Sequence, residues 1–348
     1  MHRSLLVLAI AVAVAGFGQR TSAQGLTFSL FERYLESLRE NAGIPGMSAL
    51  VLQGGSEVWS AGFGRADIDS SARPTADTPY LIGGLSQTIG ATLVLKKCID
   101  ESFATLNDPV AEWVQGFPES STTIAQLLAH VSPNTGAFNY DLTRFGALTP
   151  VVEACGDMSY APLLWSEILA PMGMAFSSPG TALVRPTATD LSQFEPEELA
   201  HFAEVVNRLA KPYHVDRGRH VRTEVSPVRV NAATGIVSSV RDLAKFDRYL
   251  SDDDVLESQT LHRAWQQVAP GIPSGLGWLV QAYNREPVVW QFGRVDGAYS
   301  ALIVKGPNRD LTFIVLANSD ALAAPFNGDS LDVTASLFAR LFLLTFIS

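Results

Sequence analysis

The chain has 348 residues, of which 47% are hydrophobic and 17% are charged, and its formal net charge is −10. This length and apolar content supply a large hydrophobic core, which excludes a disordered chain. The negative charge, without any basic cluster, argues against nucleic acid or an anionic membrane surface as a partner.

The first 23 residues have the pattern of a secretory signal. His2 and Arg3 form a basic start, Leu5–Ala15 is an apolar run, and Thr21–Ala23 fits a cleavage site of small residues. The run is shorter than the roughly 20 residues that a spanning helix needs, so a cleaved signal is favoured over an anchor. We therefore predict an exported, periplasmic or extracellular protein with one domain over 24–348 and no integral membrane span after cleavage.

The mature chain is expected to begin with a helix and a hairpin. Apolar residues between 28 and 41 recur at the spacing of one helical face, and Gly43 with Pro45 then ends the helix. Two short strand-like runs follow, 47–52 and 58–63, and the glycine pair between them indicates an antiparallel hairpin.

The far end of the sequence mirrors this beginning. Three strand-like runs are followed by a closing helix, and they cover residues 276–283, 298–305, 312–317 and 331–346. Asp332 and Arg340 interrupt the apolar surface of the closing helix, so packing against the sheet is favoured over a transmembrane tail.

Helical patterns and long loops dominate the middle, without any long strand alternation. The predicted helices cover 88–98, 122–130, 149–155, 160–169 and 196–209. This order predicts an α+β fold: an antiparallel sheet flanked by N- and C-terminal helices, with an inserted all-α subdomain. The sheet part would comprise about 24–80 and 231–348, and the helical part about 81–230.

Two small groups of residues raise the question of a disulfide or a metal. Cys98 and Cys155 are too few for a disulfide scaffold, and two buried thiols on helices are favoured over the one bridge that they could form. His214, Asp216 and His220 lie in a charged, arginine-rich loop, where a solvated surface is favoured over a metal site. We expect neither a metal nor a cofactor.

Several strings between 31 and 318, in the correct order, resemble the serine β-lactamase-like family. That family includes class C β-lactamases, penicillin-binding proteins, D-alanyl-D-alanine carboxypeptidases and related esterases. The strings are Gly43–Gly46, Gly62–Asp67, Leu106–Val110, Ile124–Ser132, Pro171–Met174, Thr234–Phe246 and Gly275–Trp278. The resemblance implies a β-lactamase/transpeptidase-like fold over nearly the whole mature chain.

The resemblance also implies a nucleophilic serine at the head of a helix and a lysine one turn later, in a Ser-x-x-Lys motif. Residues i and i+3 share a helix face, so the lysine can help the serine lose its proton. In this chain, residues 80–88 occupy the motif, with Gly84 at the serine position and Gln87 at the lysine position. None of the five lysines has a serine three residues before it, so the motif is absent from the chain.

The other two motifs of the family are also altered. The Tyr-x-Asn motif matches residues 140–142, which keep Tyr140 but have Leu142 in place of the asparagine. The third motif, a basic residue followed two positions later by glycine, matches Gln291 and Gly293. The resemblance assigns the oxyanion hole to the backbone amides of Gly84 and Arg294.

Three hypotheses follow for function. The favoured one is a pseudoenzyme that binds a small-molecule or peptide carboxylate, with Gln87, Gln291 and Arg294 as polar contacts and Leu142 as an apolar wall. The alternative is an active serine hydrolase, of esterase, β-lactamase or peptidase type, that uses Ser86 as nucleophile with help from Tyr140. The third is a protein-binding module that uses the fold as a scaffold.

Overall fold

The computed structural model describes residues 25–251, 255–326 and 331–347. The predicted signal sequence therefore lies outside the described residues. A helix over residues 25–41 comes first, as expected, and leads into the predicted hairpin. Within the described ranges, no helix is both long enough and apolar enough to span a membrane.

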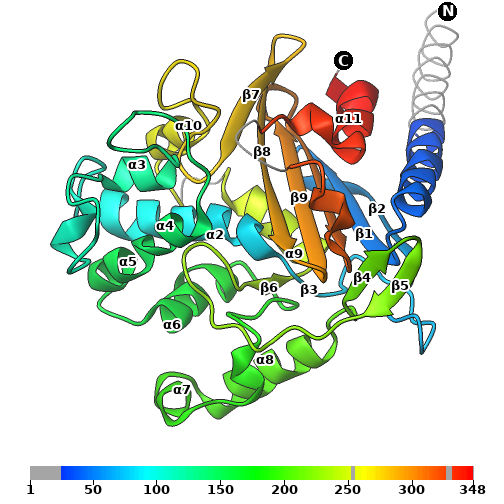
Figure 1. The fold of residues 1–348 in the computed structure, drawn as a ribbon, viewed down its shortest axis with the longest axis horizontal. Coiled ribbons are helices and arrows are strands. Elements are labelled where there is room, and N and C mark those ends of the chain that lie inside the picture. The colour runs from blue at the N-terminus through cyan, green and yellow to red at the C-terminus, as the bar shows by residue number, and fades with distance from the viewer. Residues whose placement is uncertain (1–24, 252–254, 327–330, 348) are drawn as a thin grey trace, which may run out of the picture.

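A six-stranded antiparallel sheet forms the centre of the molecule (Figure 1), and its strand order is β2-β1-β10-β9-β8-β7. The strands are β1 (Gly46–Gln53), β2 (Ser56–Gly64), β7 (Leu279–Tyr283), β8 (Glu286–Val295), β9 (Tyr299–Gly306) and β10 (Leu311–Ala317). β1 pairs with β10 from Met47 opposite Ala317 to Gln53 opposite Leu311, so the two ends of the sequence meet in the middle of the sheet.

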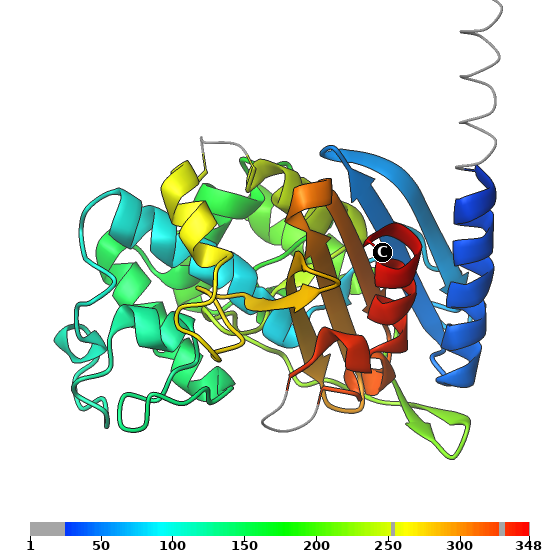
Figure 2. The same ribbon diagram turned by 90° about the horizontal axis from the view of Figure 1, so that it is seen from above.

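Both faces of the sheet are buried, and alternate residues of each strand point to opposite faces. On one face, Val51 and Phe313 pack with Phe31 and Leu35 of the N-terminal helix and Phe342 of the C-terminal helix. The opposite face is covered by the helical layer, and its core residues include Leu50, Ile314, Leu243 and Ile89. Figure 2 shows these three layers, with the terminal helices on one side of the sheet and the remaining helices on the other.

Short helices separated by long loops occupy most of the chain between β2 and β7. They are α2 (Ser86–Val94), α3 (Ile124–Leu128), α4 (Leu142–Gly146), α5 (Leu148–Gly156), α6 (Tyr160–Leu164), α7 (Ala188–Gln193), α8 (Pro196–Asn207), α9 (Val240–Tyr249) and α10 (Ser258–Ala264). Four of these helices, α4, α7, α9 and α10, lie outside the predicted helical ranges. Helix α9 packs on the sheet through a buried ion pair between Asp247 and Lys305 of β9.

Three predictions need correction. The predicted strand runs pass from 276–283 directly to 298–305, so β8 was missed. The middle of the chain contains a hairpin, β4 (Tyr213–Asp216) and β5 (Arg219–Arg222), where no strand was expected. All of β5 is exposed, so its sequence carries no alternation of apolar and polar residues. The closing helix α11 (Leu337–Phe342) begins later than predicted, because the Ser336 side chain caps it by accepting a hydrogen bond from the Ala339 amide.

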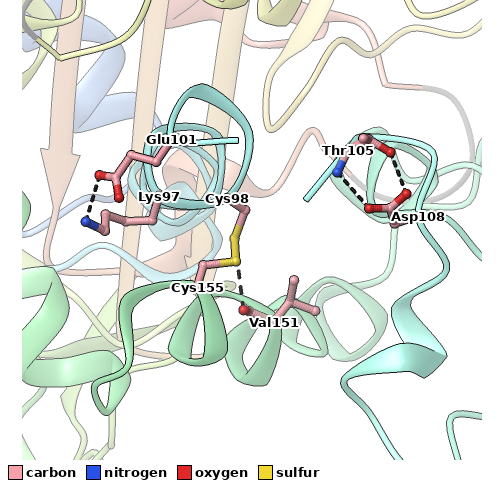
Figure 3. The surroundings of a disulfide bond; sticks show 7 residues. All are labelled: Lys97, Cys98, Glu101, Thr105, Asp108, Val151 and Cys155. Atoms are coloured by element: carbon pink, nitrogen blue, oxygen red, sulfur yellow. Dashed lines mark hydrogen bonds and ion pairs between the residues drawn. A yellow bond between two sulfur atoms is a disulfide. The ribbon is translucent and has the colours of Figure 1, made fainter. Parts of the chain in front are cut away.

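The preference for two free thiols is also wrong, because Cys98 and Cys155 form a disulfide (Figure 3). Cys98 lies in the π-helical turn Leu95–Asp100 that continues α2, and Cys155 lies in α5. Their Cα atoms are 5.3 Å apart, although 57 positions separate them in the sequence. The bridge therefore joins the helix that carries the altered motif to the helical layer behind it.

Replacing both cysteines by alanine should lower the free energy of unfolding by about 2–4 kcal/mol, because the unfolded chain then loses a long covalent loop. Urea unfolding of the mature chain, followed by circular dichroism, measures this change. Reductant should move wild-type protein toward the variant and leave the variant unchanged. Two reactive thiols in unreduced, denatured wild-type protein would contradict the bridge.

Candidate functional site

The altered motif lies at the N-terminus of α2, where the helical layer meets the sheet. The short strand β3 (Tyr80–Leu81) pairs with β6 (Val237–Ser238) and leads into the 3₁₀ turn η1 (Gly83–Leu85), after which α2 begins at Ser86. All residues of this turn are buried. The strand, the turn and the helix together hold the motif in place.

Two glycines allow the turn η1 to approach β8. A Cβ atom at Gly293 would lie 1.8 Å from the Ile82 carbonyl oxygen, so only glycine fits there. Gly83 has a φ of +53°, which favours glycine, and its α-carbon faces the backbone of Arg294. The backbones at the serine position and at the end of the third motif are therefore adjacent.

Gly84 faces the other residues of the altered motifs. A Cβ atom built on Gly84 would lie 3.1 Å from Tyr140 Oη, 3.2 Å from Leu142 Cδ2 and 3.4 Å from Gln87 Nε2. Two segments that are far apart in sequence, 84–87 and 140–142, thus meet at the position where the resemblance expects the nucleophile. Leu142 begins α4 directly after Asp141, whose carboxylate caps that helix.

A chain of hydrogen bonds runs through Gln87. Its Nε2 donates to Tyr140 Oη at 2.9 Å, and its Oε1 lies 2.5 Å from His130 Nε2. His130 Nδ1 accepts a hydrogen bond from the Asp141 amide at 3.1 Å. Since Nδ1 is an acceptor in a neutral imidazole, the ring proton lies on Nε2 and is donated to Gln87.

The titratable side chains that bond to Gln87 are uncharged at neutral pH. Burial, reinforced by the positive charge of Arg144, lowers the pKa of His130 to about 3. Desolvation raises the pKa of Tyr140 well above its ordinary value, against the opposing effect of the Gln87 hydrogen bond. Neither side chain can therefore take the place of the missing lysine as a base near neutral pH.

Ring contacts hold Tyr140 and His130 in place. The two rings are 4.5 Å apart between centroids, Phe292 of β8 stacks on Tyr140 at 5.2 Å, and Phe145 stacks on His130 at 5.3 Å. His130 was not among the site residues expected from the sequence. The only sequence feature that marked His130 was its position near the end of the family-like string 124–132. Nothing in that string indicated that His130 contacts Gln87.

Ser86, the alternative nucleophile, is fully buried and lies on a different side of the helix start. Its Oγ accepts a hydrogen bond from the Ile236 amide at 3.2 Å. Tyr140, its expected helper, bonds to Gln87 instead. This geometry favours a structural role for Ser86, which ties α2 to the segment before β6.

The polar side chains expected on β8 have partners of their own. Gln291 is buried, and its Oε1 accepts a hydrogen bond from the amide of the next residue, Phe292, at 3.0 Å. The Arg294 guanidinium contacts two carboxylates, with Nε 2.8 Å from Asp296 and Nη2 3.1 Å from Asp320. Arg294 therefore contributes its backbone to this region, while its side chain is held by acidic groups.

The histidines of the arginine-rich loop lie in the exposed hairpin. His220 Nε2 donates to the Gly43 carbonyl at 2.9 Å, and Asp216 lies 3.6 Å from the Arg219 guanidinium. His214 is exposed on β4. Within the described residues, no group of three or more such side chains is arranged to hold a metal ion.

Comparison with known proteins identifies the family. The family model described as Beta-lactamase matches residues 31–335. The chain belongs to the beta-lactamase family. Penicillin-binding protein 4* of Bacillus subtilis (strain 168) is 23% identical to it over 331 residues, which cover 78% of this chain and 68% of that protein.

Solved structures agree on the fold of this beta-lactamase family member. The octameric penicillin-binding protein homologue from Pyrococcus abyssi matches with a TM-score of 0.72 at 20% identity, covering 91% of this chain and 77% of that chain. A class C beta lactamase from Rhodobacter sphaeroides matches with a TM-score of 0.67 at 18% identity, covering 91% and 99%. The chain thus has the β-lactamase/transpeptidase-like α+β fold.

The buried neutral His130 should make this family member less stable in acid. Unfolded histidine has a pKa of about 6.5, so below that pH the unfolded state binds a proton that the folded state excludes. Stability therefore falls as the pH drops from about 6.5 towards 3, and His130 alone should account for about 2 kcal/mol lost between pH 8 and pH 5.

Urea unfolding at pH 8 and pH 5 measures this loss. The difference between the two pH values should shrink by about 2 kcal/mol in His130→Gln. The exposed His262 of α10 offers a matched control, and His262→Gln should keep the wild-type difference. Equal pH differences in the two variants would show that His130 is not the group responsible.

Proposed function

We propose that this protein is an exported member of the beta-lactamase family that has lost Ser-x-x-Lys acyl transfer and binds an acyl or carboxylate group at Gly84. The observation that carries this proposal is the convergence of Gly84, Gln87 and Tyr140. The backbone site persists, but the groups that would react are replaced by a glycine and by a neutral hydrogen-bonded amide.

Several features together argue against the family reaction. Gly84 has no side-chain oxygen to attack a carbonyl, and the Gln87 amide does not titrate near neutral pH. In a well-studied serine hydrolase, loss of the nucleophile alone lowers turnover by about 10⁶. Loss of both nucleophile and base should leave little of this activity, and the buried hydrogen bond of Ser86 gives no support to a substitute nucleophile.

The same features support binding. The Tyr140 oxygen accepts a hydrogen bond from Gln87 Nε2, so the hydroxyl hydrogen of Tyr140 is available to another acceptor. Without a side chain at Gly84, a ligand oxygen can approach this hydroxyl and the backbone amides of residues 84 and 294. Leu142 beside them suits an apolar part of the ligand. A peptide that ends in a carboxylate has these groups.

The disulfide supports the proposal that the protein is exported. Bridges such as Cys98–Cys155 form and persist in oxidising compartments and are rare in the cytosol of most cells. The disulfide is therefore consistent with the proposal that residues 1–23 are a signal sequence that directs the protein to the periplasm or the cell exterior.

Wild-type protein should not be labelled by a fluorescent penicillin, whereas Gly84→Ser combined with Gln87→Lys should gain a covalent adduct. Gly84 does not require a left-handed backbone, so serine fits after shifts of a few tenths of an ångström. Gel fluorescence and intact mass would detect the adduct. Gly84→Ser alone should react more slowly, because Gln87 cannot accept the proton.

Labelling of the wild type would overturn the loss of acyl transfer. If Ser86→Ala then abolished the label, the alternative of a serine hydrolase with Ser86 as nucleophile would be established. A wild-type label that survives Ser86→Ala would point to a different nucleophile.

Wild-type protein should bind a peptide ending in D-alanyl-D-alanine, and Gly84→Ala should weaken binding about tenfold, or about 1.4 kcal/mol. The added methyl group would occupy the space beside the Tyr140 hydroxyl. Gly146→Ala is the matched control, because its Cβ atom would lie 3.8 Å or more from other groups. Titration calorimetry measures the affinities; no saturable binding, or equal affinities in the two variants, would contradict the proposal.

A further inference from the structure

We propose that a second cavity, separate from the Gly84 site, binds an anionic amphipathic small molecule, with an acidic group on an apolar body. The cavity has a volume of about 480 Å³ and is bordered by the end of α8, by β3 and by the start of β9. Figure 1 shows α8 below the sheet, β3 near the lower edge of the sheet and β9 within it. Its volume lies in the range of roughly 300–1,000 Å³ that is usual for small-molecule sites.

The charge of the cavity is opposite to that of the protein. The chain has 25 lysines and arginines against 35 acidic residues, but the lining contains Arg185, Lys211 and Arg222 against Glu224 alone. A local excess of positive charge in a concave surface attracts anions. The sign of the charge therefore indicates an anionic ligand.

Two of these basic side chains have no acidic partner of their own. Within the described residues, neither Lys211 nor Arg185 has a carboxylate oxygen within 4.0 Å of its charged nitrogen atoms. Arg222, by contrast, lies 3.0 Å from a carboxylate oxygen of Asp69. Lys211 and Arg185 are thus the groups available to an acidic ligand.

The cavity also has an apolar wall that is held in position. Leu81 and Tyr299 line it and are almost completely buried. The Tyr299 hydroxyl donates to the Ala210 carbonyl at 2.7 Å, and the Lys211 amide donates to the Ala66 carbonyl at 2.7 Å. Because these bonds fix the wall and the lysine backbone before any ligand binds, little ordering is required on binding.

The two sites share no residue. None of the residues that converge on Gly84 lines the cavity, although Leu81 lies only two positions before Gly83. Binding at the cavity therefore does not depend on the proposed function of the Gly84 site, and each site can be tested with its own variant.

The probe 8-anilinonaphthalene-1-sulfonate tests this proposal, because it combines a sulfonate with an aromatic body and fluoresces when bound. Folded full-length mature protein should bind it saturably, and Lys211→Gln with Arg185→Gln should weaken binding about tenfold or more. Arg219→Gln removes one positive charge from an exposed residue outside the cavity and should leave binding unchanged. Gly84→Ala should also leave it unchanged.

Two further measurements make the result decisive. The neutral analogue N-phenyl-1-naphthylamine lacks the sulfonate, so the double variant should bind it as the wild type does. Circular dichroism and a thermal melt establish that each variant is folded, since this dye also binds exposed core surface. Absence of saturable binding, or equal affinities of the double variant and Arg219→Gln for the sulfonate, would overturn the proposal.

Discussion

The antiparallel pairing of β1 with β10 is the constraint on which the remaining architecture depends. It joins the first and last strands of the chain, so the helices at both termini cover one face of the sheet together. Everything between β2 and β7 must then leave the sheet and return to it. The helical layer occupies the opposite face, and the segment that enters it first, β3 with η1 and α2, carries the altered motif.

The close approach of β8 to η1 connects this architecture to the site. Gly293 and Gly83 allow two backbones to meet where larger residues would collide. This contact does not involve a side chain at position 84 or 87. The backbone geometry of the site therefore does not depend on which side chains those positions carry. Different residues thus set the shape of the site and its chemistry. The two glycines and the stacked rings maintain the backbone geometry, while a few polar groups determine which chemistry is possible there.

The buried amide of Gln87 has hydrogen-bond partners on both sides. A buried amide without partners would be destabilising, but Gln87 has His130 on one side and Tyr140 on the other. The neutral imidazole is itself held by the Asp141 amide. Gln87 thus belongs to a network of neutral groups, with no charge that a buried site would have to compensate.

The family, five of the six strands of the sheet and the absence of Ser-x-x-Lys can be read from the sequence, because these depend on local strings and on periodicity; β8 was not predicted. The partners of side chains far apart in sequence became known only from the fold: the Cys98–Cys155 bridge, the bond of Gln87 to His130, and the contact of Arg294 with Asp320. The exposed hairpin β4–β5 also escaped prediction, since a strand without a buried face has no alternating pattern. The reason is common to all four: contacts between residues distant in sequence, or between a residue and solvent, leave no local periodic signal.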